Sequence, residues 1–367
     1  MRDDVSEALI DVSSASVRLT WNWRVKSRIT KIRNDYDVGD YVQDGLVLHF
    51  DGIRNAGADV AHDAVATTWV NLGTAGDACN AEFDCQMSGS TASGSWAADG
   101  YNFVYGGKFA KILDQPALDW QTTVQVVCEA GAKECDYPSL FGSSGDYCNI
   151  YTKDENGLRI CFKPLAKATL AKAGWDGEYV NAIWHGGKYA LFCTTVPEPA
   201  DWTGTWRGSM DVLKDHTFYI GGVDWGNDNG TNLRRFTGKI QAVRVYRRSL
   251  SDEELAHNRI VDDARFKGRL PASNVTIVCE CSELDAAETP GDYLVEGTYT
   301  FTATTAIDKR GKTRSVVGYT IRTWNGSAWG APVTHEGTSY TYTGGASPAK
   351  VKLKWNLRSD CMVFMIR

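Results

Sequence analysis

One stretch of the chain alternates apolar and polar residues with a period of two and then passes directly into a helix start. Val243 and Val245 share one face of the stretch. The other face carries Arg244, Tyr246 and Arg248. This spacing predicts a β-strand with one face against a core and the other mostly towards water.

Ile240 is out of phase with the two valines. Either a β-bulge near Gln241 and Ala242 shifts the alternation, or both faces of the strand are partly covered at that end. The sequence leaves these two explanations open.

A capped helix is predicted immediately after this strand. Ser251 precedes Glu254 by three residues, which is the spacing of a reciprocal capping box. Leu250 and Leu255 occupy the positions of a hydrophobic staple, and the acidic residues of the first turn favour the positive end of the helix. Gly268 and Pro271 are the expected stop signals.

From residue 45 to residue 247, short apolar or alternating runs recur between Gly, Asn, Asp and Ser residues. This pattern predicts an all-β protein with two packed sheets and jelly-roll connections. The predicted strands span residues 45–50, 67–71, 102–105, 122–128, 149–152, 158–163, 180–184, 188–194, 217–221 and 239–247.

The run Gly-x-Ile-x-x-Val-Arg-Val-Tyr-x-Arg-x-Leu-Ser-Asp-Glu-Glu-Leu at 238–255 resembles the closing strand and trailing helix of LamG-like domains. These are jelly rolls of the concanavalin A type. Residues 44–52 and 67–73 are similar to the opening strands of the same family, so the resemblance covers about residues 40 to 262. It implies a concanavalin A-like sandwich with one short helix at its C-terminal end.

A second, smaller β-sandwich of immunoglobulin-like size is predicted for residues 271–367. It lacks the Cys…Trp…Cys spacing of true immunoglobulin domains and resembles, in type only, the repeats that accompany jelly rolls in large bacterial surface proteins. Trp324 and Trp329 flank an Asn-Gly turn signal, which predicts a hairpin with ring packing across it. The predicted organisation is an N-terminal segment at 1–36, a jelly roll at 37–268 and this sandwich.

The N-terminal segment contains a possible internal repeat. Residues 13–24 align without gaps to residues 347–358, 334 positions further on (347 minus 13), and seven of the twelve residues are identical. We interpret residues 13–24 as a strand left over from a preceding copy of the module. The alternative is a chance match between two generic strands. Such a strand would need a partner edge in either domain or in a neighbouring molecule.

Composition narrows the classes of function. The chain has 367 residues, 43% of them hydrophobic and 23% charged, and no apolar run long enough to span a membrane. A net charge of −6 without a basic block disfavours nucleic acid as a partner. The N-terminus lacks the layout of a secretion signal, so the chain is either cytoplasmic or a piece of a longer exported protein. The repeat favours a secreted or cell-surface protein.

Ten cysteines form no zinc-site spacing. Their even number suits disulfides in an exported protein, and Cys79/Cys85 and Cys128/Cys135 are close enough to close small loops. Others lie in apolar strands, where a buried thiol is a common core residue. We expect at most some of the ten to pair.

Catalysis is disfavoured. A retaining glycoside hydrolase needs two carboxylates about 5 to 5.5 Å apart. The Glu-x-Asp-x-x-Glu run that glucanases of the superfamily use matches only Glu283 to Glu288, in the smaller domain, where the composition predicts a loop. No Gly-x-Ser-x-Gly elbow and no HExxH pair are present.

Calcium is the cofactor that the sequence favours. The segment 224–230 is dense in the hard oxygen donors that calcium requires, and Asp51 at the end of an early strand is another acidic candidate. The predicted ligands are Asp51, Asp224, Asn227 and Asp228. The same Asn-Asp-Asn-Gly sequence also suits a turn that holds no ion.

Carbohydrate recognition by a β-sandwich uses flat aromatic faces and a few polar groups. Several tryptophans lie beside Gly and Asp in predicted loops, and His185 occupies a turn position after a strand. The predicted ligand-binding residues are Trp175, His185, Trp202, Trp206 and Trp225. Alternatively, these rings close the ends of the sandwich.

The sequence as a whole predicts a non-catalytic, lectin-like module of a secreted or cell-surface bacterial protein, with a glycan or a surface protein as partner. The first alternative is a structural or adhesive spacer that binds a protein partner. A glycoside hydrolase is the third hypothesis.

Overall fold

The computed structural model describes residues 28–85, 91–114, 116, 118, 122–131, 138–143, 148–152, 157–162, 168–171, 179–185, 188–193, 217–223, 235–279, 283–308, 311–345 and 350–358. The chain divides into two compact units. The larger unit spans Asn34–Leu270, and the smaller unit combines Met1–Arg33 with Pro271–Arg367. Both units are built from β-strands, so the predicted all-β sandwich fold is confirmed.

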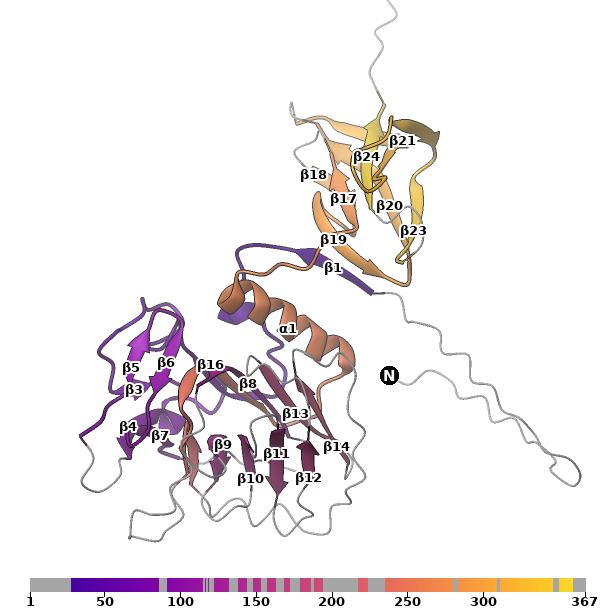
Figure 1. Ribbon diagram of the computed structural model, residues 1–367. Coiled ribbons are helices and arrows are strands. Elements are labelled where there is room, and N and C mark those ends of the chain that lie inside the picture. The colour runs from indigo at the N-terminus through magenta and orange to yellow at the C-terminus, as the bar shows by residue number, and fades with distance from the viewer. Residues whose placement is uncertain are drawn as a thin grey trace, which may run out of the picture. The chain divides into compact units, whose positions relative to one another are not determined.

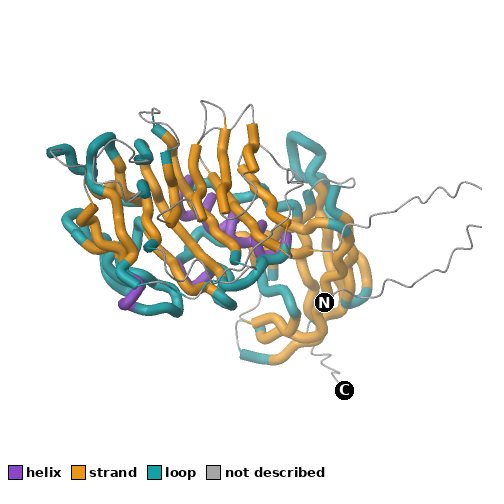
Figure 2. The backbone as a smooth tube through the Cα atoms, turned by 90° about the horizontal axis from the view of Figure 1, so that it is seen from below, coloured by secondary structure: helices purple, strands orange, loops and turns teal. Residues whose placement is uncertain are grey.

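The larger unit contains two antiparallel sheets, and its strands lie side by side in Figure 2. The eight-stranded sheet has the order β12 (Ala168–Ala171), β11 (Gly157–Phe162), β10 (Cys148–Thr152), β9 (Ser139–Ser143), β15 (Phe218–Ile220), β7 (Phe109–Ile112), β4 (Ala81–Cys85) and β3 (Thr68–Trp69). The seven-stranded sheet has the order β14 (Lys188–Cys193), β13 (Tyr179–His185), β8 (Thr123–Ala130), β16 (Gly238–Tyr246), β6 (Gly100–Phe103) and β5 (Ser95–Ala97), and β2 (Leu46–Asp51) also pairs with β16. Two 3-10 turns, η1 (Val38–Asp40) and η2 (Asp77–Cys79), lie between strands. The arrangement is jelly-roll-like.

Aromatic rings from both sheets fill the core of the larger unit. Trp69 is fully buried, and its ring contacts Phe50, Phe83 and Trp96 at centroid distances of 5.9, 6.3 and 5.1 Å. Its indole Nε1 donates a hydrogen bond of 3.0 Å to the carbonyl oxygen of Asp51, which satisfies the one polar atom of the ring. This ring therefore holds the end of β2 in place.

β16 contains a β-bulge, which is one of the two explanations that the sequence allowed for the position of Ile240. In its pairing with β8, Ile240 lies opposite Cys128 and Ala242 lies opposite Val127, so Gln241 is the additional residue. Because of this extra residue, the side chain of Ile240 points to the same side of the sheet as those of Val243 and Val245. Ile240 therefore packs in the same core as the valines of β16.

The outward face of β16 differs from the prediction, because Arg244 and Tyr246 are fully buried and do not face water. The reason is helix α1 (Asp252–Lys267), which lies over β8 and β16 (Figure 1). The alternation identified which residues share a face, but it could not show that a helix covers that face.

Helix α1 begins and ends as predicted. Ser251 Oγ accepts from the amide of Glu254, and the Glu254 carboxylate accepts from the amide of Ser251 at 2.8 Å. Leu250 and Leu255 are buried together with Leu46 beside β16. Gly268 ends the helix in the left-handed conformation with φ of 59°.

The smaller unit has one main sheet in the order β1 (Arg28–Ile32), β19 (Gly291–Glu296), β17 (Val275–Val278), β24 (Val351–Leu357), β21 (Thr313–Thr323), β20 (Thr298–Ile307) and β18 (Glu283–Ala286). β22 (Val333–Glu336) pairs with β21, and β23 (Ser339–Thr343) pairs with β20. Phe301 and Trp355 are buried in its core. The sequence pattern of this unit predicts strands at 274–281, 298–304, 314–324, 339–343, 349–358 and 361–366, of which 361–366 lies outside the described residues. Strands β1, β18, β19 and β22 are additional to that prediction.

The predicted tryptophan hairpin forms with a one-residue shift. Trp324 and Trp329 form a bridge, and their rings meet edge to face at 5.4 Å. The amide of Asn325 donates to the carbonyl of Ala328 at 3.2 Å, so the two central residues of the turn are Gly326, with φ of 100°, and Ser327. The sequence predicted Asn325 and Gly326 at these two positions. Asn325 flanks the turn because its side chain accepts hydrogen bonds from the amides of two later residues.

The described cysteines agree with the expectation that at most some of the ten pair. Cys79 and Cys85 are both thiols, so the small loop that their spacing would allow is not closed by a disulfide. Cys128 is also a thiol, buried in β8. Cys279, the residue directly after β17, is disulfide-bonded.

Within the part of the chain that the structure describes, no helix combines the length and the apolar character needed to cross a membrane.

A close backbone approach at the end of β2 yields a stability prediction. A Cβ atom on Gly52 would lie 2.4 Å from the carbonyl oxygen of Asp99, whereas a Cβ atom on Gly39 would meet no atom within 4 Å. We expect Gly52→Ala to lower the free energy of unfolding of the larger unit by about 1–3 kcal/mol, since the backbone must shift. Gly39→Ala is the matched control. Equal melting temperatures for the two variants in thermal unfolding would contradict the prediction.

Candidate functional site

Most of the predicted ligand and metal residues lie outside the described residues: Trp175, Trp202, Trp206, Asp224, Trp225, Asn227 and Asp228. His185 is the last residue of β13, opposite Lys188 across the β13–β14 hairpin. Asp51 is the last residue of β2 and is fully buried. The predictions for tryptophan platforms and for calcium therefore stay predictions.

The carboxylate of Asp51 is surrounded by hydrogen-bond donors. Arg265 of α1 donates to both of its oxygens, at 2.6 and 3.1 Å, and the amides of Ile53 and Arg54 donate at 3.0 and 2.9 Å. Such a fork-to-carboxylate contact is the strongest type of protein ion pair. Asp51 thus joins the end of β2 to the last turns of α1.

His49 lies two residues earlier on the same face of β2. Its Nε2 is 3.7 Å from a carboxylate oxygen of Asp51, and its ring meets Tyr41 edge to face at 5.1 Å. Burial lowers the pKa of His49, although the nearby Asp51 opposes this change. Burial alone would raise the pKa of Asp51, but the contacts with His49 and Arg265 outweigh it and hold that pKa well below its usual value.

A buried ion pair lies beneath the middle of α1. Nη2 of Arg244 on β16 donates to Asp262 of α1 at 2.5 Å, and both side chains are almost completely buried. The hydroxyl of Tyr41 donates to the other carboxylate oxygen of Asp262 at 2.9 Å. The guanidinium carbon of Arg244 lies 4.0 Å from the centre of the Tyr41 ring. Burial raises the pKa of Tyr41 well above its usual value, and the charge of Asp262 adds to this effect.

The side chain of Asn258 completes this polar layer. Its amide nitrogen donates to Gln125 of β8 and to the hydroxyl of Tyr246, both at 2.8 Å. Its oxygen accepts from the amide of Val42 at 3.0 Å. Both the nitrogen and the oxygen of this side-chain amide thus have hydrogen-bond partners in the protein. These bonds fix the position of α1 on the sheet.

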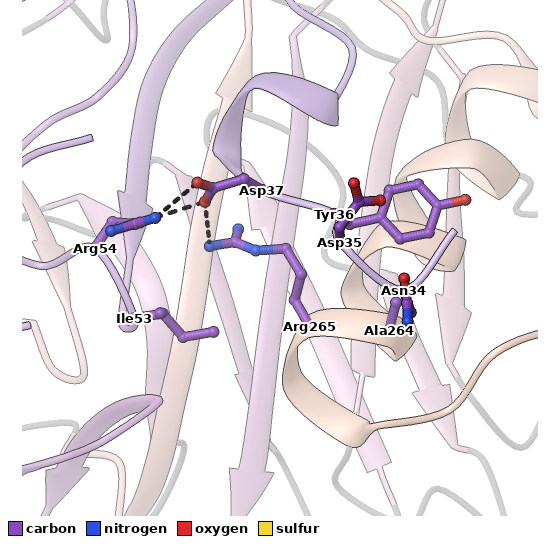
Figure 3. Close-up of a pocket in the computed structure, with 8 residues that line it drawn as sticks. All are labelled: Asn34, Asp35, Tyr36, Asp37, Ile53, Arg54, Ala264 and Arg265. Atoms are coloured by element: carbon purple, nitrogen blue, oxygen red, sulfur yellow. Dashed lines mark hydrogen bonds and ion pairs between the residues drawn. The ribbon is translucent and has the colours of Figure 1, made fainter. Parts of the chain in front are cut away.

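An open pocket of about 410 Å³ lies at the C-terminal end of α1 in the larger unit (Figure 3). Three segments form it: the residues before η1, the loop after β2, and the last turns of α1. Its lining residues are Asn34, Asp35, Tyr36, Asp37, Ile53, Arg54, Ala264 and Arg265.

Asp37 lies between two guanidinium groups in this pocket (Figure 3). Arg54 donates to its two oxygens at 3.3 and 2.8 Å, and Arg265 donates from a longer distance of 3.4 Å. The hydrogen bond from Arg54 lowers the pKa of Asp37, although burial opposes it, and the amide of Val38 and the charge of Arg265 lower it further. Asp37 and Arg54 are both partly exposed, so a ligand can reach them.

The sequence analysis did not identify this pocket. The run Asn34-Asp35-Tyr36-Asp37 combines an aromatic ring with amide and carboxylate oxygens, as the segment 224–230 does, so the same criterion could have selected it. The residues next to Arg54 and Arg265 in the sequence do not indicate a binding site, because only the fold brings these two side chains to Asp37.

The two described carboxylates of the run at 283–288 lie in different surroundings. Contrary to the prediction of a loop, Glu283–Ala286 form strand β18. Asp285 is exposed and accepts hydrogen bonds from Thr304 and Thr305, whereas Glu288 is buried and accepts from Tyr299.

Among the described residues, no group of three or more His, Cys, Asp or Glu side chains is placed to hold a metal ion. The calcium ligands predicted at 224–228 lie outside those residues. Asp51 is engaged by Arg265 as described above.

The buried ion pair can be tested with a double-mutant cycle. We expect Asp262→Asn to lower the free energy of unfolding of the larger unit by about 3–5 kcal/mol, because it leaves the Arg244 charge buried without its counter-charge. Arg244→Met combined with Asp262→Asn should cost less than the sum of the two single substitutions. Additive losses in chemical denaturation would contradict this coupling.

The burial of His49 predicts an acid-sensitive larger unit. The pKa of the folded state is lowered, so only the unfolded chain takes up this proton as the pH falls below about 6.5. Stability from this group should therefore fall with decreasing pH, by at most about 1.4 kcal/mol per pH unit. The contribution of Asp51 is present above its unfolded pKa near 3.8 and is lost only at lower pH.

His49→Gln should flatten the stability of the larger unit between pH 6.5 and 5, measured by chemical denaturation at each pH. The control is His335→Gln, which replaces an exposed histidine of the smaller unit. An unchanged slope in His49→Gln would show that this residue does not carry the effect.

No protein-family model and no curated protein matches the chain. Among solved structures, a mutant of Trypanosoma rangeli sialidase with trans-sialidase activity is 14% identical with a TM-score of 0.42, over 60% of this chain and 33% of that one. Domain 4 of a GH43 extracellular arabinanase from Geobacillus stearothermophilus, in complex with arabinotriose, is 16% identical with a TM-score of 0.38, over 61% of this chain and 100% of that one. The CBM40 of a Ruminococcus gnavus sialidase, bound to sialyllactose, is 22% identical with a TM-score of 0.30, over 38% of this chain and 81% of that one. The chain thus spans about a third of the sialidase that it matches, and these TM-scores are too low to establish a shared function.

Proposed function

We propose that the larger unit is a non-catalytic glycan-binding module. The observation that carries this proposal is the open pocket of about 410 Å³ beside Asp37, which has the size of a small-ligand site. A sugar presents hydroxyl groups that both donate and accept hydrogen bonds, together with apolar faces on its ring. A site for it therefore combines polar side chains of both kinds with an aromatic or aliphatic surface.

The pocket lining offers this combination. Asn34 carries an amide that donates and accepts, Asp35 carries a carboxylate, and Arg54 is a planar donor. Tyr36 and Ile53 supply apolar surface. Because the positive and negative groups of the pocket are partly paired with each other, the site favours a neutral ligand over a strongly charged one.

The electrostatics of the pocket favour binding over hydrolysis. The acid of a glycoside hydrolase keeps its proton because its pKa is raised. The pKa of Asp37 is lowered instead by the hydrogen bond from Arg54. Asp37 therefore suits hydrogen bonding to a ligand and not proton donation to a leaving group.

The resemblance of residues 238–255 to LamG-like domains supports the same proposal. It also suggests a second glycan-binding site in the larger unit, separate from the pocket at Asp37. Trp175, Trp202, Trp206, Trp225 and His185 would form a glycan platform, with calcium held at Asp224, Asn227 and Asp228. The proposed setting is a secreted or cell-surface protein.

Glycan-array screening followed by calorimetric titration tests the proposal. We expect binding of at least one glycan, and we expect Tyr36→Ala to weaken it at least tenfold if the pocket holds the sugar. Tyr105→Ala is the matched control, because Tyr105 is an exposed tyrosine of the same unit that does not line the pocket. Loss of binding on adding a chelator, or in Trp225→Ala, would place the sugar at the predicted loop platform.

No binding across diverse glycans would reject the proposal and favour a structural or adhesive spacer. Turnover of any polysaccharide would reject both and favour the hydrolase.

A further inference from the structure

The smaller unit is discontinuous in sequence. Strand β1 pairs along its whole length with β19, from Arg28 opposite Glu296 to Ile32 opposite Asp292. The whole larger unit follows before the chain returns to the same sandwich at β17. The larger unit is therefore an insertion between two strands of the smaller one.

The repeated segment before β1 matches the core of this sandwich. Residues 13–24 align with residues 347–358, which contain β24. The identical pairs include Val17 with Val351, Leu19 with Leu353 and Trp21 with Trp355. In β24 these three side chains are 1%, 0% and 2% exposed and make up its core-facing side. Residues 13–24 thus carry the apolar side chains that the β24 place requires.

The same offset continues beyond the segment. Residues 28–33, which contain β1, align with residues 362–367, and Ile32 and Arg33 match Ile366 and Arg367. The sequence of β24 is therefore followed, at the same spacing, by a segment that corresponds to β1.

The topology prevents one sandwich from using both N-terminal strands. β1 is antiparallel to β19, β19 is antiparallel to β17, and β17 is parallel to β24, so β1 and β24 run in the same direction. If residues 17–23 occupied the β24 place, the link to Arg28 would have to return along a seven-residue strand, about 23 Å. It would also have to cross three strand spacings, about 14 Å.

The link from Trp23 to Arg28 is too short for that path. Its five Cα steps reach at most about 18 Å, and parallel neighbours are usually joined by a dozen or more residues. With β1 seated at β19, residues 17–23 can fill a β24 place only in a different sandwich.

We propose that residues 13–24 take the β24 place in the smaller sandwich of a second copy of this module when that copy's own β24 leaves it. Copies would then join sandwich to sandwich through the short link at 24–27, and each would carry its larger unit as an insertion between β1 and β17. The partner is a second copy of this chain, and the binding surface is the core groove between β17 and β21 that β24 otherwise fills.

Full-length variants test this proposal. Leu353→Asp with Trp355→Asp puts two carboxylates into the core and should displace a molecule's own β24. We expect the N-terminal segment of another molecule to take its place, and light scattering coupled to gel filtration should show at least a twofold higher mean mass than the wild type, in whole multiples of the chain mass.

The matched control is Leu19→Asp with Trp21→Asp, which should keep the wild-type mass and both melting transitions. Combining all four substitutions should abolish the assembly. The proposal is wrong if Leu353→Asp with Trp355→Asp and the fourfold variant have the same mass distribution. An equal distribution would show that residues 13–24 do not cause the assembly, and this holds also if both variants unfold or aggregate. Because no glycan is involved, this outcome is independent of the proposed binding function.

Discussion

The ion pair between Arg244 and Asp262 is the contact on which the organisation of the larger unit depends. A charged pair without water is stable only when its geometry is good and its remaining hydrogen-bonding groups find partners. Asp262 meets this condition through Arg244 and Tyr41. Because a guanidinium and a carboxylate must meet in one orientation, the pair restricts where α1 lies on β16 far more than apolar contacts alone would.

The pocket is a consequence of that restriction. Once Asp262 is fixed over β16, Arg265 in the next turn reaches the carboxylate of Asp51 at the end of β2. The same guanidinium also reaches Asp37, which draws the segment before η1 towards the loop that carries Arg54. A buried contact therefore organises a partly exposed site through one helix turn.

The sequence predicted those features whose causes are local. The capping box at Ser251 and most strands of the larger unit depend on neighbouring residues, and the structure contains them. The bulge beside Gln241 is one of the two explanations that the sequence left open for Ile240. The burial of Arg244 could not be predicted, because a charged residue in alternation normally faces solvent and only α1 changes that. The pocket escaped prediction for a related reason, since Asp37, Arg54 and Arg265 are far apart in the sequence. β18 was missed because its polar composition resembles that of a loop.

The discontinuity of the smaller unit imposes a constraint on folding. Strand β1 meets β19 only after about 260 residues have been made, and closing so long a loop of flexible chain is entropically costly. A compact larger unit reduces that cost, because a folded domain has a much smaller radius than the same residues unfolded. The polar layer under α1 consequently matters to both units. By helping to hold the inserted unit compact, it shortens the effective loop that β1 must close.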